Sequence, residues 1–157
     1  MEPRIPLTKY SPEALKALQS LERHVKASGL PENLIHLIKM RASQINGCAY
    51  CLDMHSKDAR ANGETEQRLY GLNAWRETPY YTPKERAALE WAESLTFVSE
   101  THVPDEVYER VRKEFTPQEL VDLTYAVAAI NAWNRLAIST RAVPGEYQPQ
   151  KKGASAS

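Results

Sequence analysis

Apolar residues recur every three to four positions along most of this chain, and no stretch shows sustained alternation of apolar and polar residues. The first predicted helix shows the pattern, with Leu15, Leu18 and Val25 on one face. Such spacing is typical of an amphipathic α-helix. We therefore predict an all-α bundle of about seven helices, over residues 11–27, 31–46, 48–61, 64–76, 82–100, 105–115 and 117–140.

Hydroxyl-proline pairs mark where these helices start, and glycines mark where several of them stop. Thr82 and Thr116 each precede a proline and stand three residues before a glutamate, which is the spacing of a capping box. Ser11 precedes Pro12 in the same way. The Asn46-Gly47 pair predicts a break, and Asn62-Gly63 suits the left-handed cap that ends many helices.

The helix predicted over 117–140 is apolar nearly all round. A helix of that kind is usually buried, so we expect it to run through the bundle centre or into a subunit interface, and we expect a homo-oligomer. Asn131 and Arg135 lie one turn apart on this helix. Because buried polar groups need partners, we expect them to make a structural bond to another helix or subunit.

The length of 157 residues fits one domain. We assign residues 1–145 to a single helical domain and residues 146–157 to a flexible C-terminal tail, because the chain after Pro144 has too few apolar residues to order itself.

Charge and hydropathy exclude several classes of function. Lys plus Arg and Asp plus Glu each number 20, without long runs of one sign, so we expect no nucleic-acid partner. The sequence shows neither a long apolar run nor a basic segment followed by an apolar stretch, so we expect no membrane span and no export. We therefore expect a cytoplasmic protein, where a close cysteine pair is more often catalytic or metal-binding than a structural bridge.

Cys48, Cys51 and His55 are the residues that point to chemistry. Residues three and four apart share a helix face, so the two sulfurs are within reach of a disulfide with His55 beside them. The amino end of a helix favours a thiolate, and a thiolate attacks a peroxide to give a sulfenic acid that the second thiol can condense with. Which sulfur attacks stays open on these grounds, because the helix end acts most strongly on Cys48 whereas His55 is better placed for Cys51.

Several alternatives remain beside this interpretation. A zinc site needs four ligands, and the chain offers one cysteine pair plus four histidines, namely His24, His36, His55 and His102. A thioredoxin would carry its cysteines in a βαβ setting that this sequence lacks. The cysteines could also serve a general thiol-disulfide oxidoreductase, or pack or bind metal in a non-catalytic oligomeric helical scaffold. We expect no cofactor and no metal.

The segment from Ile38 to Arg60 reads IKMRASQINGCAYCLDMHSKDAR and closely resembles the AhpD-like alkylhydroperoxidases of the carboxymuconolactone decarboxylase family. The similarity continues at 85–93, 119–123 and 131–136. It implies an all-helical enzyme, assembled as a trimer or hexamer, that reduces hydrogen peroxide or organic hydroperoxides. It further implies Cys51 as the peroxide-reacting thiol, Cys48 as the resolving thiol, His55 as part of a proton relay, and an external thiol or dithiol as reductant. Lactone decarboxylation, the reaction of the family's namesake, does not call for a cysteine pair.

The chain departs from this family pattern at two positions. Peroxidases of the family usually carry a glutamate twelve residues before the first cysteine, and that position holds His36 here. A histidine can also relay a proton, with a reference pKa near 6.5 instead of about 4.3, so our hypothesis is that the relay persists with an altered pH dependence. Tyr50 stands between the cysteines, where the best-known peroxidase of the group has a histidine.

Overall fold

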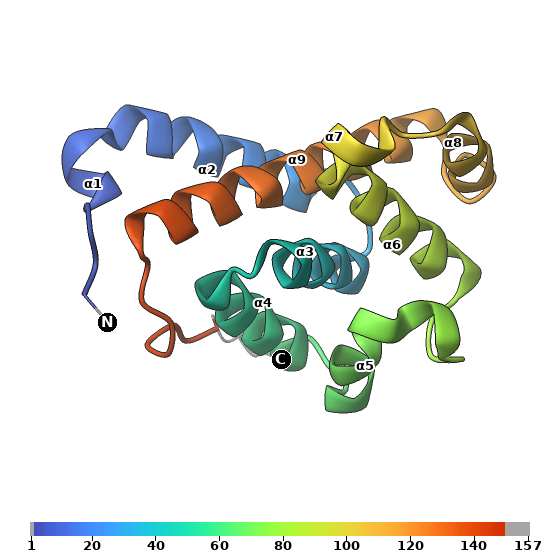
Figure 1. The fold of residues 1–157 in the computed structure, drawn as a ribbon, viewed down its shortest axis with the longest axis horizontal. Coiled ribbons are helices and arrows are strands. Elements are labelled where there is room, and N and C mark those ends of the chain that lie inside the picture. Colours follow the sequence, from blue (N-terminus) through green and yellow to red (C-terminus); the bar gives the residue numbers. More distant parts are fainter. Residues whose placement is uncertain (1, 150–157) are drawn as a thin grey trace, which may run out of the picture.

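The computed structural model describes residues 2–149, and within them it contains helices and no strand. This confirms the predicted all-α class. Figure 1 shows the elements in order, and their bounds are α1 Leu7–Tyr10, α2 Pro12–Ala27, α3 Glu32–Asn46, α4 Ala49–Ala61, α5 Glu66–Gly71, a 3-10 helix Leu72–Glu77, α6 Pro83–Thr96, α7 Val98–Thr101, α8 Asp105–Val111 and α9 Pro117–Thr140.

The described part therefore has more helical elements than the predicted seven, for local reasons. The helix predicted over 64–76 divides at Gly71, where α5 ends and a 3-10 helix begins, and Ala74 kinks that second element with φ −116° and ψ 31°. The helix predicted over 82–100 divides at Phe97, where φ is −95° and ψ is 32°. The Thr101 hydroxyl donates to the Ser94 carbonyl at 2.8 Å across this break. The short α1 precedes the first predicted helix.

The predicted caps explain where the long helices begin and end. Thr82 and Thr116 each accept a backbone N–H of the glutamate three residues on, and each glutamate accepts the threonine N–H in return, so both capping boxes are confirmed. Gly47 ends α3 in the left-handed region at φ 69°. A residue with a Cβ atom is strained at such a φ, and this turn sets the direction in which α4 starts.

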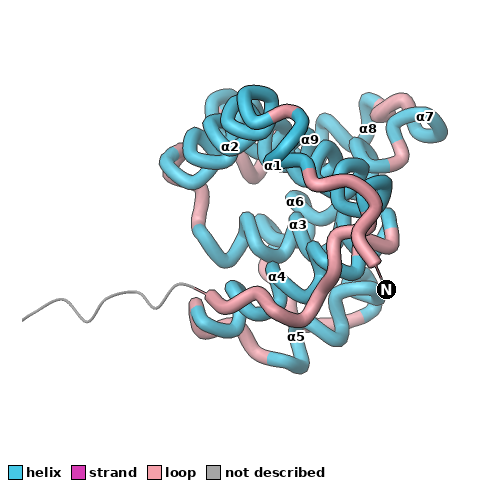
Figure 2. Tube along the Cα trace, turned by 90° about the vertical axis from the view of Figure 1, so that its left-hand side faces the viewer, coloured by secondary structure: helices cyan, strands magenta, loops and turns pink. Residues whose placement is uncertain are grey.

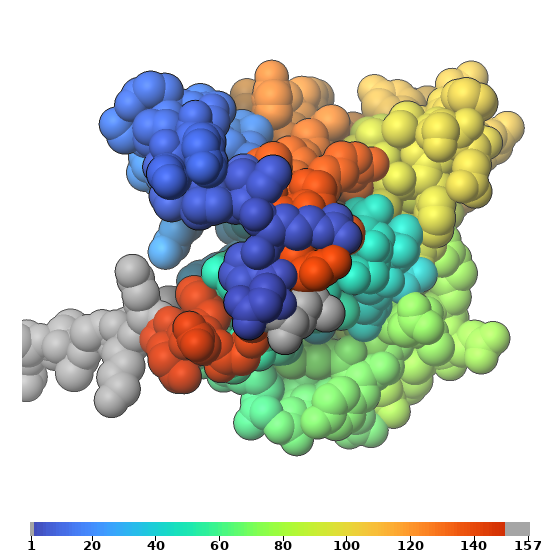
Figure 3. Space-filling model, turned by 60° about the vertical axis from the view of Figure 1, so that its left-hand side comes forward, coloured from blue at the N-terminus to red at the C-terminus, as the bar shows by residue number. Residues whose placement is uncertain are grey.

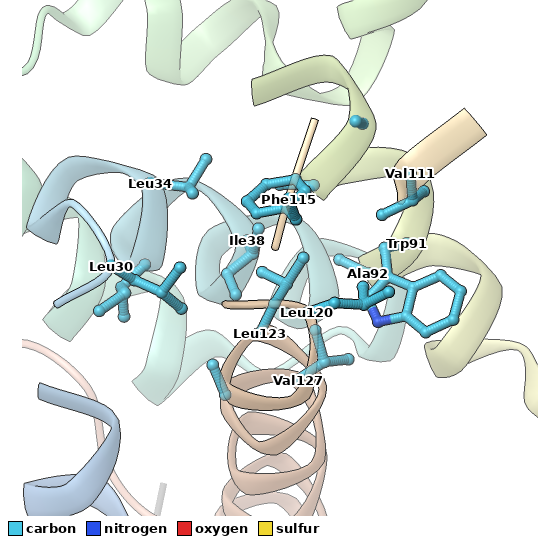
Figure 4. Close-up of a cluster of buried hydrophobic side chains, with 14 of the residues drawn as sticks. Leu30, Leu34, Ile38, Trp91, Ala92, Val111, Phe115, Leu120, Leu123 and Val127 are labelled. Atoms are coloured by element: carbon cyan, nitrogen blue, oxygen red, sulfur yellow. The ribbon is translucent and has the colours of Figure 1, made fainter. Parts of the chain in front are cut away.

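Helix α3 lies at the centre and packs against α4, α6 and α9, while α2 runs along α9 (Figures 1 and 2). The largest cluster of buried apolar side chains joins α3, α6 and α9 (Figure 4). Ile38, Trp91 and Leu123 contribute one large side chain from each of these helices. Helix α3, which carries His36, is therefore part of this core, and α4, which carries the cysteine motif, packs against α3.

Helix α9 is buried along one face only. Leu123, Val127 and Ile130 are fully buried, whereas Val121, Tyr125 and Ile138 are 50%, 49% and 47% exposed. The fold thus covers the core side of this apolar helix, leaves Val121 and Tyr125 on its outer side, and leaves Ile138 exposed near its carboxyl end.

The segment after α9 returns to α4. The Lys57 ammonium donates to the carbonyls of Gly145 and Tyr147, and the Tyr147 hydroxyl donates to Asp58 at 2.7 Å. Figure 3 shows the chain ends from this side of the molecule, with the N-terminal segment lying across the end of α9. Of the predicted tail, residues 146–149 are described and Tyr147 contacts α4, while 150–157 lie outside the described residues. None of the helices within 2–149 combines the length and apolar character needed to cross a bilayer.

Candidate active site

The two cysteines lie at the amino end of α4. Cys48 is the N-cap residue, its Sγ accepts the backbone N–H of Cys51 at 3.4 Å, and the two residues form a disulfide with their Cα atoms 5.4 Å apart. The left-handed Gly47 makes this arrangement, because it turns the chain sharply between α3 and α4. The partial positive charge at a helix amino end stabilises a thiolate at the N-cap when the bond is reduced.

Apolar side chains enclose both sulfurs. Cys48 and Cys51 are each 1% exposed and pack with Ala42 and Ile130, and the partly buried Tyr50 and Trp133 cover them, together with Ala137. A solvent molecule therefore reaches the sulfurs only when neighbouring side chains move.

His55 lies one helical turn after Cys51 on the buried face of α4 and is 6% exposed. Burial holds its pKa well below 6.5, and the nearby charges of Lys39 and His36 lower that pKa further. The ring is therefore neutral at pH 7 and can accept a proton. Its Nδ1 is buried and has no hydrogen-bond partner among the described residues.

The structure places His36 beside His55, with the ring centroids 6.2 Å apart and the planes at 48°. Burial is the largest influence on the pKa of His36 and lowers it, while Asp58 and Glu32 act in the opposite direction. The Nε2 of His36 is 3.8 Å from a Glu32 carboxylate oxygen, and its Nδ1 is buried without a hydrogen-bond partner in the described part of the chain.

Asp58 completes this group, which we call the histidine cluster: His36, His55 and Asp58. One ligand-type atom from each residue lies within 4.8 Å of the others. The Tyr147 hydroxyl donates to the Asp58 carboxylate, and burial together with this carboxylate raises the pKa of Tyr147. The hydroxyl therefore stays protonated and orients Asp58.

Lys39 is a buried cation close to the cluster. It is 5% exposed and forms an ion pair with Glu22 of α2. A buried ammonium needs such a partner, because an unpaired charge in the interior is strongly unfavourable. The pair leaves a positive charge near both histidines, which explains part of their lowered pKa values.

A second polar group, the turn network, holds the Asn46-Gly47 turn against α9 and α6. It consists of Ser43, Asn46, Thr96, Asn131 and Asn134. The Asn46 amide donates to Asn134 at 2.8 Å and to Asn131 at 3.0 Å, and the Asn134 amide donates to the Ser43 hydroxyl at 3.0 Å. The Asn131 amide donates to Thr96 at 3.1 Å. This confirms the predicted bond from Asn131 to another helix, whereas the Arg135 guanidinium bonds Asn131 within its own helix.

A pocket lies on the other face of α4. It has a volume of about 850 Å³, and Leu52, Lys57 and Arg60 are among the residues that line it. Neither cysteine and neither histidine of the cluster lines it. This pocket is therefore separate from the cysteines and from both histidines.

Two residues of this site were not singled out from the sequence. Asp58 had a signal, because it follows His55 by three positions and so shares its helix face. No sequence signal pointed to Tyr147, because its hydrogen bond with Asp58 joins residues 89 positions apart.

Comparison with known proteins gives a family match. Residues 12–94 match the model of the carboxymuconolactone decarboxylase family. Over 139 residues the chain is 45% identical to "Uncharacterized protein YdfG" of Bacillus subtilis, an alignment that covers 88% of this chain and 95% of that protein.

Two solved structures share the fold. A protein of unknown function from Agrobacterium tumefaciens, described as a candidate antioxidant defence protein AhpD, is 46% identical, with a TM-score of 0.89 over 93% of this chain and 100% of that chain. An uncharacterized peroxidase-related protein from Silicibacter is 25% identical, with a TM-score of 0.77 over 87% of this chain and 72% of that chain.

Proposed function

This chain belongs to the carboxymuconolactone decarboxylase family, and we propose that within it the protein is a thiol-dependent peroxidase reducing hydrogen peroxide or organic hydroperoxides. The observation that carries the proposal is the disulfide between Cys48 and Cys51 across the first turn of α4, with a buried His55 one turn further on. A neutral imidazole in that position is a proton acceptor, and a thiol needs one to become the reactive thiolate.

The cycle starts from the reduced pair. His55 takes the proton of the Cys51 thiol, and the thiolate attacks the terminal peroxide oxygen, so that the O–O bond breaks. The leaving alkoxide, or hydroxide in the case of hydrogen peroxide, takes the proton from His55 and departs as alcohol or water. Cys51 is then a sulfenic acid. The Cys48 sulfur attacks the Cys51 sulfur and releases water, which closes the disulfide. An external thiol or dithiol must reopen it by exchange.

The N-cap position suits Cys48 to the second step. Its Sγ already accepts the Cys51 N–H in the disulfide form, and the same N–H would stabilise the Cys48 thiolate once the bond is reduced. A stabilised thiolate close to Cys51 resolves the sulfenic acid before further oxidation.

His36 and Asp58 extend the relay beyond His55. His36 stands where the family's peroxidases usually carry a glutamate, and the Asp58 carboxylate lies in the same cluster. We infer that Asp58 supplies the negative charge which the replacement at position 36 removes, and that a proton taken up by His55 is shared with this cluster.

Sulfenic acid trapping tests the assignment of roles. Reduced Cys48→Ser protein treated with one equivalent of hydrogen peroxide and dimedone should carry the adduct on Cys51, because no resolving thiol remains. Cys51→Ser protein should carry little or none, and the double variant gives the background. An adduct of equal yield on Cys48 in the Cys51→Ser protein would reverse the roles, and no adduct in either would leave a structural cysteine pair.

A thiol-disulfide oxidoreductase is the second candidate, and the N-cap position of Cys48 favours it, since such a cysteine is the usual attacking thiol in exchange. The burial of both sulfurs argues against it, because a protein disulfide is larger than a peroxide. Reduction of insulin disulfides by the reduced protein, at a rate comparable to its reaction with peroxide, would favour this candidate.

We further propose that the protein works as a homo-oligomer, a trimer or a hexamer, in the reducing cytoplasm. The exposed Val121 and Tyr125 on the outer side of α9 support association, because a second copy would cover them. Light scattering on the purified protein gives the mass directly, and a monomer at micromolar concentration would contradict this part.

A further inference from the structure

We propose that His36, His55 and Asp58 bind one divalent transition-metal ion of zinc-like ligand preference. Their ligand-type atoms lie within 4.8 Å of one another, and residues 2–149 contain no other such group of histidine, cysteine and carboxylate side chains. This revises the expectation of no metal and differs from a zinc site on the cysteines, since neither sulfur takes part.

Buried atoms without partners are the second observation. The Nδ1 atoms of His36 and His55 are both buried and accept or donate no hydrogen bond within the described part of the chain, although His55 is only 6% exposed. Nearly all buried polar atoms in proteins have a partner, and leaving one without costs about 1–3 kcal/mol. A metal ion bound through these nitrogens would satisfy them.

The ligands come from rigid elements. His55 and Asp58 project from one face of α4, and His36 projects from α3, which packs directly against α4. Ligand atoms around a tetrahedral zinc ion lie about 3.3 Å apart, a separation that follows from bond lengths of about 2.0–2.2 Å. The ligand atoms must therefore approach one another by up to about 1.5 Å, a change within the reach of side-chain rotations.

Neighbouring groups complete the surroundings of the ion. The Tyr147 hydroxyl donates to Asp58 and fixes the carboxylate, which is the usual role of an outer-sphere partner. Glu32 adds negative charge beside His36. Lys39 opposes a cation here, but its ion pair with Glu22 offsets much of that charge.

The ligand set selects the class of metal. Two imidazoles and one carboxylate suit Zn²⁺, Co²⁺, Ni²⁺ or Cu²⁺, whereas Mg²⁺ and Ca²⁺ prefer sites built from oxygen alone. Three protein ligands leave a fourth position for water or another small ligand, as in zinc sites that are not purely structural.

Calorimetric titration with Zn²⁺ tests the proposal on the full chain, without a histidine tag, after chelator treatment and with the Cys48–Cys51 disulfide intact. The disulfide form carries no thiol, so the result does not depend on the proposed peroxidase activity. We expect one Zn²⁺ per chain, no competition from excess Mg²⁺, and a visible d–d spectrum when Co²⁺ replaces Zn²⁺.

Two single variants locate the site. His36→Gln and Asp58→Asn should each weaken Zn²⁺ binding by about tenfold or more, while His102→Gln, at an exposed histidine outside the cluster, should leave it unchanged. Far-ultraviolet circular dichroism of each variant shows whether the helices persist. Absence of Zn²⁺ binding to the parent protein, or equal affinity in the parent and in both folded variants, would overturn the proposal.

Discussion

The two polar groups along the α3–α4 pair differ in how completely their atoms are paired. In the turn network, the Asn134 side chain is wholly buried and bonds both Asn46 and Ser43. In the histidine cluster, His36 and His55 each keep a buried Nδ1 without a hydrogen-bond partner among the described residues.

The completeness of hydrogen bonding separates a structural polar group from one that can carry out chemistry. A buried network with all its groups paired fixes one arrangement of helices and has no spare capacity for a ligand or a proton. A buried ring with an unpaired nitrogen destabilises the fold slightly and keeps a lone pair or an N–H available. The cysteines lie beside the first group, and α4 leads from them to the second.

The largest effect on activity is expected at Cys51, the proposed attacking thiol, which belongs to neither group. Cys51→Ser should lower peroxide turnover with a dithiol reductant by about 1000-fold or more, because the oxygen of serine does not replace the thiolate. Cys51→Ser should keep the helical signal of the parent, which serves as the folding control. Retention of more than a tenth of the turnover would exclude Cys51 as the attacking thiol.

The next largest effect is expected on the free energy of unfolding, when the turn network is disrupted. Asn134→Leu should lower the free energy of unfolding by about 3 kcal/mol, because Ser43 loses its bond to Asn134 inside the protein and Asn46 loses one of two bonds. Urea unfolding at pH 7.5 measures the change. A loss below about 0.5 kcal/mol would mean that the network does not hold the turn.

The loss of stability in acid tests the histidine cluster. The pKa of His55 is well below 6.5 in the folded chain and near 6.5 when unfolded. Between these values the unfolded chain binds a proton that the folded chain does not, so stability falls as pH drops below 6.5.

For one histidine that stays neutral when folded, the loss between pH 7.5 and 5.5 is on the order of 1 kcal/mol. Urea unfolding at both pH values should therefore show a smaller loss for His55→Gln than for the parent, by about that amount, with the disulfide intact in both proteins. Equal losses would mean that His55 is protonated in the folded chain.

Access to the sulfurs should show as a smaller change in rate. Tyr50 partly covers the enclosed cysteines, so Tyr50→Ala should speed disulfide formation by cumene hydroperoxide several-fold more than by hydrogen peroxide. Tyr70→Ala, at a side chain 76% exposed, is the matched control. An equal effect on both oxidants would show that Tyr50 does not limit entry.

The smallest effect is expected from His36→Leu, which introduces the same side chain as Asn134→Leu. Measured in chelator at pH 7.5, it should leave the free energy of unfolding unchanged or raise it by up to about 1 kcal/mol, because a buried nitrogen without a partner is removed. A loss comparable to that of Asn134→Leu would remove the distinction between the two regions.

Many helix boundaries of this fold could be predicted from local signals in the sequence. Thr82, Thr116 and Gly47 end or begin helices through bonds and backbone angles that involve only near neighbours, so the boundaries they set could be predicted. The spacing of Cys48, Cys51 and His55 likewise needs only helix geometry.

What could not be predicted depends on contacts between distant segments. Three such contacts each join separate elements. They are the ion pair of Lys39 with Glu22, the hydrogen bond from Tyr147 to Asp58, and the packing of Trp133 against the cysteines. A helical pattern indicates which residues share a face but not which other helix covers that face. His36 could be singled out only from a resemblance, and its place beside His55 comes from the packing of α3 on α4.

Counting thiols and peroxide together tests the redox assignment most directly. Fully reduced protein is mixed with one equivalent of hydrogen peroxide, and both the remaining thiols and the remaining peroxide are followed against time. We predict that one peroxide disappears for every two thiols lost, with an intramolecular disulfide as the product, and that the reaction is far faster than with free cysteine at the same pH. Thiols that persist, or that react no faster than free cysteine, would contradict it.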